Sequence, residues 1–310
     1  MDRFEAYATF VAVAETRGFA VAARKLGRSA PAVTRIIAAL EVELGTPLFR
    51  RTTRVVNLTE AGASFLASAK RILADVAEAS AAVAGAHASL RGPLVVTASV
   101  MFGREHVAPI LLRFLGKHPE IRARALLVDR VVELVDEGVD VAVRIAHLRD
   151  STLRAARVGE VRLVTCASPA YLAARGTPRD PQDLAAHAVV AFAHGSIVRE
   201  WSFPHARRAK RVVVEPRFIT NSTETSIAAA VAGHGITRAL SYQVAEHVVA
   251  GRLEVVLADH EPPTIPIQVV HAASPPARVR TCVDVLVEEL RKDTRLRSTL
   301  APEARKPARR

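Results

Sequence analysis

Residues 20–62 read AVAARKLGRSAPAVTRIIAALEVELGTPLFRRTTRVVNLTEAG, and the pattern in this stretch decides the fold of the N-terminal part. Two short amphipathic segments, about residues 21–26 and 30–44, are separated by Gly27, whose missing Cβ permits a tight turn. Apolar residues at helical spacing over about 4–16 predict a further helix ahead of them. Three helices joined in this way predict a helix-turn-helix.

The third helix carries the features of a helix that reads DNA. Ser29 stands at its N-cap position, and Pro31 stands in the first turn, where a missing N–H costs nothing. The inner stripe is expected to be Val33, Ile36, Ile37, Leu40 and Leu44. Small residues around one arginine on the outer face suit a helix that enters the major groove. The expected DNA-facing residues are Ser29, Ala30, Pro31, Ala32, Thr34 and Arg35.

A basic, Thr-rich hairpin follows, in which residues 52–58 (TTRVVNL) read as a β-ribbon. Seven Lys and Arg residues fall between Arg24 and Arg54, against only Glu41 and Glu43. Such a wing suits contacts along phosphates or in the minor groove. The expected contacts are Arg50, Arg51, Thr53 and Arg54. The hairpin favours a winged helix-turn-helix on double-stranded DNA over the alternative, a plain helical hairpin with a solvated charged face.

A long helix begins at about residue 59 and runs to about residue 88. Apolar residues repeat along it at 4-3-4-3-4 spacing, at Phe65, Ala69, Ile72, Val76, Ala79 and Val83. This heptad pattern favours a helix that pairs with a second copy of the chain. A dimer also suits the paired half-sites that two-fold DNA-binding proteins read. The alternative is a long helix packed on its own domain.

The first 90 residues resemble the LysR-type transcriptional regulators, bacterial proteins with a winged helix-turn-helix and a dimerising linker helix. The matching residues are Phe10, Ala12-Val13, Gly18-Phe19, Ala22-Ala23, Leu26, Ser29, Pro31 to Arg35, Ile37, Leu40-Glu41, Leu44-Gly45, Leu48 to Arg51, Leu58-Thr59 and Ala61-Gly62. The resemblance implies a DNA-binding domain over residues 1–59 and a linker helix over 60–90. It also implies dimers and, because the family usually forms dimers of dimers, tetramers.

A larger second part begins where Arg91-Gly92-Pro93 breaks the long helix. Strands are expected over 94–98, 122–128 and 139–145, a loop over 99–103, and helices over 107–118 and 131–137. Strand, helix and strand at this spacing predict βαβ units and a parallel sheet. Strands over 153–158 and 162–166 follow, and the segments 168–172 and 178–184 open a second α/β unit. A strand over 265–272 and a final helix over 279–291 can return to the first unit.

A chain that leaves one lobe and returns to it forms two lobes with a cleft between them. We expect lobe one over 91–161 and 267–300, lobe two over 162–266, and a basic tail over 301–310. This part resembles the effector domain of the same family, which is similar to type 2 periplasmic binding proteins. The matching segments are Asp140 to Arg144, Ser168-Pro169, Tyr171-Leu172, Gly176 to Pro178, Asn221, Gly233, Gly235-Ile236, Gly251 to Leu253 and Val256-Leu257. The expected fold class is α+β and multidomain.

Within the family, three dipeptides resemble the CrgA-like branch. They are Gly103-Arg104, Asp129-Arg130 and Asp150-Ser151. The chain departs from the family at Thr237 to Ser241, where an apolar run with a proline is often found. Arg238 is therefore expected near the cleft, either to bind an acid or to pair with a neighbour.

The cleft is the expected site for a small-molecule effector, because ligands bind at the carboxyl ends of parallel strands. Ser99 and Thr223 offer hydroxyls, helix N-termini suit an anionic group, and Phe102 and Phe192 offer apolar surface. The expected effector-binding residues are Ser99, Val100, Met101, Phe102, Gly103, Asp129, Arg144, Phe192, His194, Asn221, Thr223 and Arg238. The alternative for each of them singly is helix capping or core packing.

Composition limits the class of protein. The formal net charge of +12 favours an anionic partner, with nucleic acid first and a membrane surface second. No run approaches the ~18–20 uninterrupted apolar residues that a membrane span needs. The N-terminus lacks the pattern of a secretory signal. We expect a cytoplasmic protein without membrane contact.

The sequence contains no HExxH, GxSxG or Walker motif, and its eleven histidines are scattered. We therefore expect neither an enzyme nor a bound cofactor or metal. Cys166 and Cys282 are the only cysteines, so a disulfide framework is unsupported. Cys166 leaves open a redox-responsive regulator as an alternative. An intracellular solute-binding module is a second alternative, which the DNA-reading segment disfavours.

Overall fold

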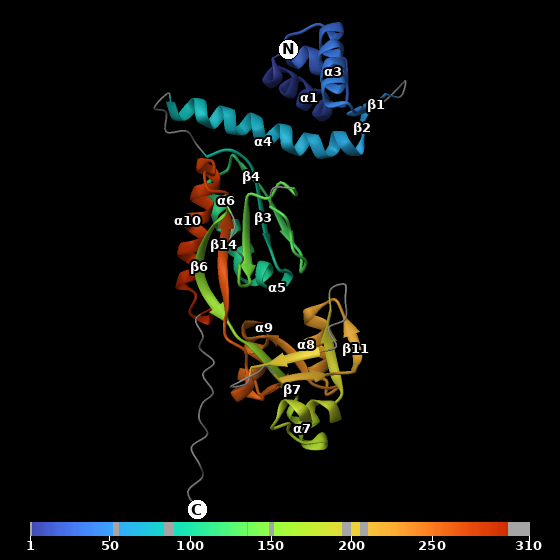
Figure 1. The fold of residues 1–310 in the computed structure, drawn as a ribbon. Coiled ribbons are helices and arrows are strands. Elements are labelled where there is room, and N and C mark those ends of the chain that lie inside the picture. The colour runs from blue at the N-terminus through green and yellow to red at the C-terminus, as the bar shows by residue number, and fades with distance from the viewer. Residues whose placement is uncertain are drawn as a thin grey trace, which may run out of the picture.

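The computed structural model describes residues 2–51, 56–83, 90–134, 136–148, 152–193, 200–204 and 210–296. Figure 1 shows three parts in chain order: a small helical domain, the long helix α4 lying across its base, and two α/β lobes. One lobe lies next to α4 and the other lies at the far end of the molecule, as both ribbon views show. The expected α+β, multidomain fold class is confirmed.

Three helices and a hairpin form the N-terminal domain. The elements are α1 (Arg3–Thr16), α2 (Phe19–Lys25), α3 (Ala30–Leu44), β1 (Phe49–Arg51) and β2 (Val56–Leu58), followed by α4 (Glu60–Val83). The strands β1 and β2 pair antiparallel, with Phe49 opposite Leu58, which confirms the predicted hairpin. Phe10, Ile37 and Leu40 are buried in the core between the helices.

The turn into α3 has the expected chemistry. Gly27 adopts a φ of 62°, in the left-handed region that favours glycine. The Oγ of Ser29 accepts the backbone N–H of Ala32 at 3.4 Å, which makes Ser29 the N-cap. The inner stripe ends earlier than expected: Leu44 in the last turn is 38% exposed.

The first turns of α4 pack on α1 of the same domain. The ring centroid of Phe65 lies 5.2 Å from that of Tyr7 and 5.1 Å from that of Phe10, and Ala69 is fully buried. The expectation that Ala69 belongs to a dimer seam is therefore wrong, because the domain's own core buries it, while Phe65 packs against the same core and is half-buried. Val76, further along α4, is 37% exposed and remains free for a partner.

Lobe one contains a five-stranded sheet. Its strands are β3 (Gly92–Ala98), β4 (Ile121–Leu127), β5 (Val141–Ile145), β6 (Arg154–Val161) and β14 (Ile265–His271). They lie in the order β4-β3-β5-β14-β6, with β3 parallel to β4 and β5, and β14 antiparallel to β5 and β6. The parallel prediction is correct for the first three strands only. The sheet is mixed because the chain enters β14 from lobe two. β14 therefore runs in the direction opposite to its neighbours β5 and β6.

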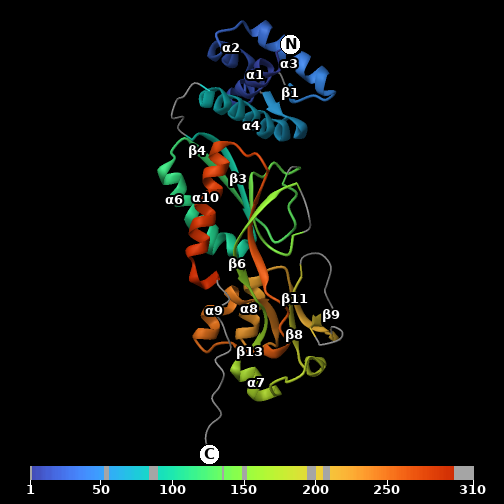
Figure 2. The ribbon, with the colours of Figure 1, turned by 60° about the vertical axis from the view of Figure 1, so that its left-hand side comes forward.

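Helices cover this sheet. They are α5 (Val100–Phe102), a π-helical segment (Gly103–Val107), α6 (Ala108–Lys117) and α10 (Ala277–Lys292), with a short 3-10 turn at Thr294–Leu296. Figure 2 shows α6 and α10 side by side along the lobe. The expected loop over 99–103 is wrong, since the helix already begins at Val100. The carboxylate of Asp129 accepts the N–H of Val100 at 3.0 Å and so caps that start.

The expected helix over 131–137 is also wrong in the residues that the structure describes, which form a turn. The N–H of Val139 donates to the carbonyl of Leu134 at 2.8 Å, and Gly138 adopts a φ of 63°. Val131 and Val132 are β-branched and favour helices weakly. The apolar spacing therefore predicted a helix where the described residues form a turn.

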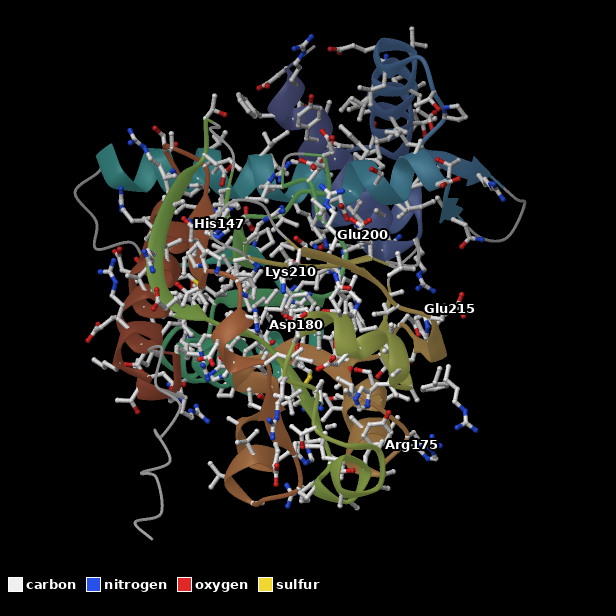
Figure 3. All side chains as sticks on the ribbon, turned by 60° about the horizontal axis from the view of Figure 1, so that its bottom comes forward. His147, Arg175, Asp180, Glu200, Lys210 and Glu215 are labelled. Carbon is white, nitrogen blue, oxygen red and sulfur yellow. The ribbon has the colours of Figure 1, made fainter. Side chains whose placement is uncertain are left out.

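Lobe two is built from short strands and helices. They are β7 (Leu163–Ala167), α7 (Pro169–Arg175), a 3-10 helix (Pro181–Ala186), β8 (Val189–Phe192), β9 (Glu200–Phe203), β10 (Lys210–Val213), β11 (Pro216–Thr220), α8 (Thr223–Val231), β12 (Thr237–Leu240), α9 (Ser241–Val249), β13 (Glu254–Val256) and a 3-10 helix (Ala258–His260). The strands β12, β7 and β13 form an antiparallel sheet, and β8 pairs parallel with β11. Lys210 Nζ pairs with Asp180 Oδ2 at 2.6 Å and joins β10 to the neighbouring 3-10 helix (Figure 3).

The chain crosses between the lobes twice, from β6 to β7 and from the 3-10 helix Ala258–His260 to β14. Arg162 lies in the first crossover and Glu261 in the second. Their side chains are largely buried and form an ion pair, with Arg162 Nη1 3.0 Å from Glu261 Oε2. The ion pair thus ties the two connections together, and we call this place the hinge between the lobes. In the described part of the chain, no helix is both long and apolar enough to cross a membrane.

Candidate DNA-reading surface and ligand cleft

The outer face of α3 is open at the positions expected to read bases. Ser29, Pro31 and Arg35 are exposed, whereas Ala30, Ala32 and Thr34 are half-buried. The hydroxyl of Thr34 donates to the carbonyl of Ala30 at 3.0 Å, so it is already engaged within the helix. Arg35 has no hydrogen-bond or ion-pair partner among the described residues. Its guanidinium group is therefore free to contact DNA.

The hairpin is held against α3 by Glu41. The Oε1 atom of Glu41 accepts the N–H of Leu48 at 2.8 Å and that of Phe49 at 3.1 Å. Sequence reasoning treated Glu41 only as a charge and missed this role, which no local spacing reveals. Arg50 is exposed on β1. The side chain of Arg51 and residues Thr53 and Arg54 lie outside the described residues.

A cavity of about 400 Å³ lies between the two lobes, where the sequence predicts the effector cleft. Six of the expected residues line it: Ser99, Asp129 and Arg144 from lobe one, and Phe192, Thr223 and Arg238 from lobe two. Thr223 is the first residue of α8, whose N-terminus therefore faces the cavity. The cavity lining includes two guanidinium groups and one carboxylate, which makes it suited to an anion.

The lobe-one groups in the cleft also support the backbone. Asp129 holds the start of α5 through the N–H of Val100. The guanidinium group of Arg144 donates to the carbonyl of Val132, in the turn that replaced the expected helix. Both side chains are therefore positioned before any ligand binds.

Arg238 is the least satisfied charged group in the cleft. Its guanidinium carbon lies 4.5 Å from the ring centroid of Phe203 and 5.3 Å from that of Trp201. Nη1 donates to the carbonyl of Ser202 at 3.4 Å, while the buried Nε and Nη2 have no hydrogen-bond partner among the residues that the structure describes. Burial lowers the pKa of Arg238 to about 10, against the smaller opposite effect of Glu261. Sequence reasoning missed the two aromatic rings, because β9 lies far from Arg238 along the chain.

Four expected cleft residues lie elsewhere. Phe102 is fully buried and stacks on His106 at 4.6 Å, so its ring belongs to the core of lobe one. Gly103 packs against Leu127, which leaves no room for a side chain. Val100 is 39% exposed and Asn221 is exposed, and neither is part of the lining. His194 lies outside the described residues.

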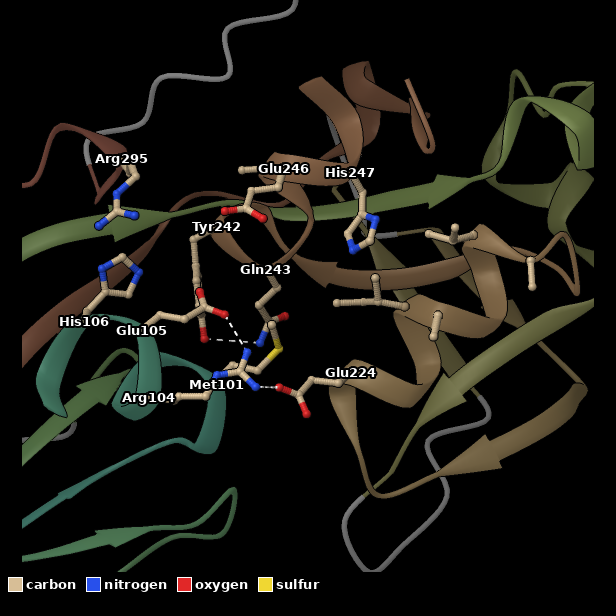
Figure 4. A pocket seen from close by; sticks show the side chains of 15 residues that line it. Met101, Arg104, Glu105, His106, Glu224, Tyr242, Gln243, Glu246, His247 and Arg295 are labelled. Atoms are coloured by element: carbon tan, nitrogen blue, oxygen red, sulfur yellow. Dashed lines mark hydrogen bonds and ion pairs between the residues drawn. The ribbon is translucent and has the colours of Figure 1, made fainter. Parts of the chain in front are cut away.

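Met101, the remaining expected residue, lines a different cavity of about 520 Å³ (Figure 4). This second cavity also lies between the lobes, with the helical stretch of residues 100–107 on one side and α8 and α9 on the other. Nothing in the sequence pattern indicated it, because its walls come from segments more than a hundred residues apart.

Two family models match the chain. The model described as "Bacterial regulatory helix-turn-helix protein, lysR family" matches residues 4–63. The model described as "LysR substrate binding domain" matches residues 87–291, which is more than half of the chain. The chain belongs to the LysR family of transcriptional regulators.

This LysR-type regulator is similar over most of its length to named members of the family. It is 32% identical to the HTH-type transcriptional regulator CrgA of Neisseria meningitidis over 289 aligned residues. The aligned region covers 92% of this chain and 96% of that protein. The HTH-type transcriptional regulator PtxR of Pseudomonas aeruginosa is 31% identical, with 91% of each chain covered. The solved structure of CrgA superposes with a TM-score of 0.57 at 32% identity, covering 92% of this chain and 98% of that one.

Membership of the family joins the two sites into one function. The helix-turn-helix domain of a LysR-type regulator binds DNA, and its larger domain binds an effector that controls transcription. The free face of α3 and the interlobe cleft of this regulator lie in the two matched segments respectively.

Proposed function

We propose that the regulator inserts α3 into the major groove of promoter DNA, with the hairpin beside it on the phosphate backbone. The free, exposed guanidinium group of Arg35 between small side chains supports this placement. The net charge of +12 adds attraction to any DNA. A protein that reads bacterial chromosomal DNA acts in the cytoplasm, where we place this one. It acts by binding rather than by catalysis.

Replacing Arg35 by alanine is expected to weaken binding to specific DNA by about 1–3 kcal/mol, because a bidentate contact to a base edge is lost. The measurement is a gel-shift titration on DNA from upstream of its own gene, with random competitor, at about 0.15 M salt. The control is Arg175→Ala, which removes the same charge from exposed α7 at the far end of lobe two (Figure 3). If Arg35→Ala weakens binding to specific and to random DNA equally, Arg35 contacts a phosphate and does not read a base.

For the cleft, we propose a small anionic effector, such as a carboxylate, that binds beside Arg238. A half-buried guanidinium group with two buried nitrogens that lack a partner in the described part of the chain is costly, and an anion at short distance offsets that cost. The N-terminus of α8 at Thr223 adds a favourable dipole from the same side. The depressed pKa of Arg238 agrees with a charge that lacks a close counterion.

Replacing Arg238 by glutamine is expected to weaken carboxylate binding about tenfold or more, because a charge-assisted hydrogen bond is lost. Thermal-shift titrations of a panel of small carboxylates, each beside its neutral amide, measure this on the full chain. Arg217→Gln, an exposed position on β11, is the matched control. Carboxylates that stabilise Arg238→Gln as well as the native chain would contradict an anion site at Arg238.

Effector control is proposed to be a population shift. A ligand that favours one arrangement of the lobes about the Arg162–Glu261 hinge also favours one spacing of the two DNA-reading domains in a dimer. Val76 on the exposed part of α4 supports pairing of two copies through that helix. A tetramer formed from two such dimers is the assembly we propose.

The two alternatives have less support. In a redox-responsive regulator, Cys166 would have to be reactive, but the thiol is fully buried and burial raises its pKa to about 12. Cys282 is buried as well, and its pKa is also raised to about 12. An intracellular solute-binding module leaves the matched helix-turn-helix domain without a purpose.

A further inference from the structure

The second interlobe cavity is not explained by DNA binding or by the anion cleft. Its volume of about 520 Å³ is sufficient for a small organic molecule. Arg104 of lobe one and Glu224 of lobe two form an ion pair at its rim (Figure 4). Gln243 lines this cavity and also the cleft, so the two spaces are neighbours.

The charge of this cavity is opposite to that of the whole chain. Its lining holds three carboxylates, those of Glu105, Glu224 and Glu246, against two guanidinium groups. Arg104 is shared by Glu105 and Glu224. The other guanidinium group, that of Arg295, is held by Asp293 at 2.6 Å. Among the described residues, the carboxylate of Glu246 forms no hydrogen bond or salt bridge, and it interacts with Arg295 only through their charges, so its oxygens remain for a ligand.

A buried acceptor lies in the same wall. The side chain of His106 is only 3% exposed, and its Nδ1 lies 3.0 Å from Asp293 Oδ2. The hydrogen bond from Arg295 and the other contacts lower the pKa of Asp293 to about 2, so it is ionised and Nδ1 must be the donor. Burial lowers the pKa of His106, which keeps the ring neutral. Nε2 therefore carries a lone pair, and it has no partner within the described part of the chain.

The geometry directs this lone pair into the cavity. His106 is part of the lining, and Figure 4 shows its ring between Arg295 and Tyr242, with one ring nitrogen toward each. The ring of Tyr242 lies edge-on to His106 at 5.7 Å. The wall also has an apolar part, from Met101 and Ile227 among others, beside the polar side chains of Gln243 and His247. A ligand that carries a cationic N–H donor on an apolar body would match three features of this cavity. These are the acceptor His106 Nε2, the lining carboxylates and the apolar side chains.

We propose that this cavity binds an organic cation, a primary ammonium group on a small apolar or aromatic body. The ammonium group donates to His106 Nε2 and lies near the free charge of Glu246, while the apolar body contacts Met101, Ile227 and the ring of Tyr242. Because both lobes contribute to the cavity, the ligand favours the interlobe arrangement in which Arg104 and Glu224 are paired.

Isothermal titration calorimetry on the full chain with three probes of the same shape tests this. The probes are 2-phenylethylamine, 3-phenylpropionate and 2-phenylethanol, which differ in charge. We expect saturable binding of the amine, with both other probes weaker by about tenfold or more, which is roughly 1.4 kcal/mol. No saturable heat with the amine, or equal affinity for the three probes, overturns the proposal.

Variants locate the binding. Ala228→Phe, at an exposed position of α8 in the cavity wall, is expected to block the amine, and His106→Phe to weaken it about tenfold or more. Glu246→Gln is expected to weaken the amine about two- to fivefold, as for an exposed ion pair, with Glu254→Gln on β13 as the control of equal charge change. Amine binding that persists in Ala228→Phe, or that is lost in Arg238→Gln, overturns the assignment. The DNA-reading surface and the anion cleft are tested separately in Ala228→Phe, by gel shifts and by carboxylate binding respectively.

Discussion

Replacing Gly62 by alanine is expected to destabilise the N-terminal domain by about 3 kcal/mol or more, because backbone has to move to admit the methyl group. A Cβ at Gly62 would lie 2.9 Å from the carbonyl carbon of Leu48 and closer still to its oxygen. That oxygen accepts the N–H of Thr59 at 2.9 Å. The added methyl group therefore separates the hairpin from the first turn of α4.

Two signals distinguish the domains in this experiment. Trp201 is the only tryptophan and lies in lobe two, so its fluorescence follows that lobe during urea unfolding. Far-UV circular dichroism also follows the helices of the N-terminal domain. In Gly62→Ala, an early dichroism transition at lower urea is expected, with the fluorescence transition unchanged. Gly116→Ala in α6 is the control, since no atom lies within 4 Å of its added Cβ. A Gly62→Ala chain that unfolds like the native one in both signals would contradict the packing argument.

Replacing Arg278 by methionine is expected to destabilise lobe one by about 3–5 kcal/mol, because a buried cation is removed and its partners remain. Arg278 at the start of α10 is 0% exposed. Its Nε donates to the carbonyl of Pro93 at 2.8 Å, and its Nη1 lies 2.8 Å from Asp75 Oδ1 on α4. The same side chain thus holds α10, the first strand of lobe one and the linker helix together.

The loss in Arg278→Met is expected to depend on pH through Asp140. Burial raises the pKa of Asp140, while the N–H of Val95 and the charge of Arg278 lower it. A carboxyl group whose pKa is raised by folding lowers stability as pH rises from its unfolded toward its folded pKa. Without Arg278 that folded pKa rises further, so the loss is expected to be larger at about pH 8 than at about pH 5.

Urea unfolding of the native chain and Arg278→Met at both pH values measures this. The control is Arg113→Met on α6, which breaks an exposed pair with Glu289 and is expected to change stability by less than about 1 kcal/mol. A loss in Arg278→Met no greater than that of the control would show that the buried guanidinium group is not needed. A loss that is the same at both pH values would exclude Asp140 from the effect.

Local chemistry made the N-terminal elements predictable. The turn at Gly27 and the cap at Ser29 each depend on residues within four positions, and the structure has both. The strands of lobe one were also placed to within a few residues, most directly β3 and β5, which are largely buried and mostly apolar. The expected site in the cleft was partly found in the same way, since strand ends locate Ser99 and Asp129 without any side-chain contact.

Long-range packing explains where the sequence interpretation was wrong. Phe65 and Ala69 fit a heptad pattern, but an apolar face packs on whichever surface is available, and α1 of the same domain is available first. Phe102 was expected to face the cleft because it follows the carboxyl end of the first strand of lobe one. The helix that begins at Val100 turns it into the core instead, where it stacks on His106.

The amino-acid sequence was sufficient to establish the family, the order of the domains and the helix expected to read DNA. Caps, turns and apolar periodicity are properties of neighbouring residues, and they persist in any tertiary arrangement. The three-dimensional fold alone decided the electrostatic roles: Arg238 over the rings of β9 with no ion pair among the described residues, Arg278 fully buried against α4, and His106 oriented by Asp293. Each of these roles depends on burial between segments that are distant in the chain, and burial is what turns an ordinary charged side chain into a binding group or a structural one.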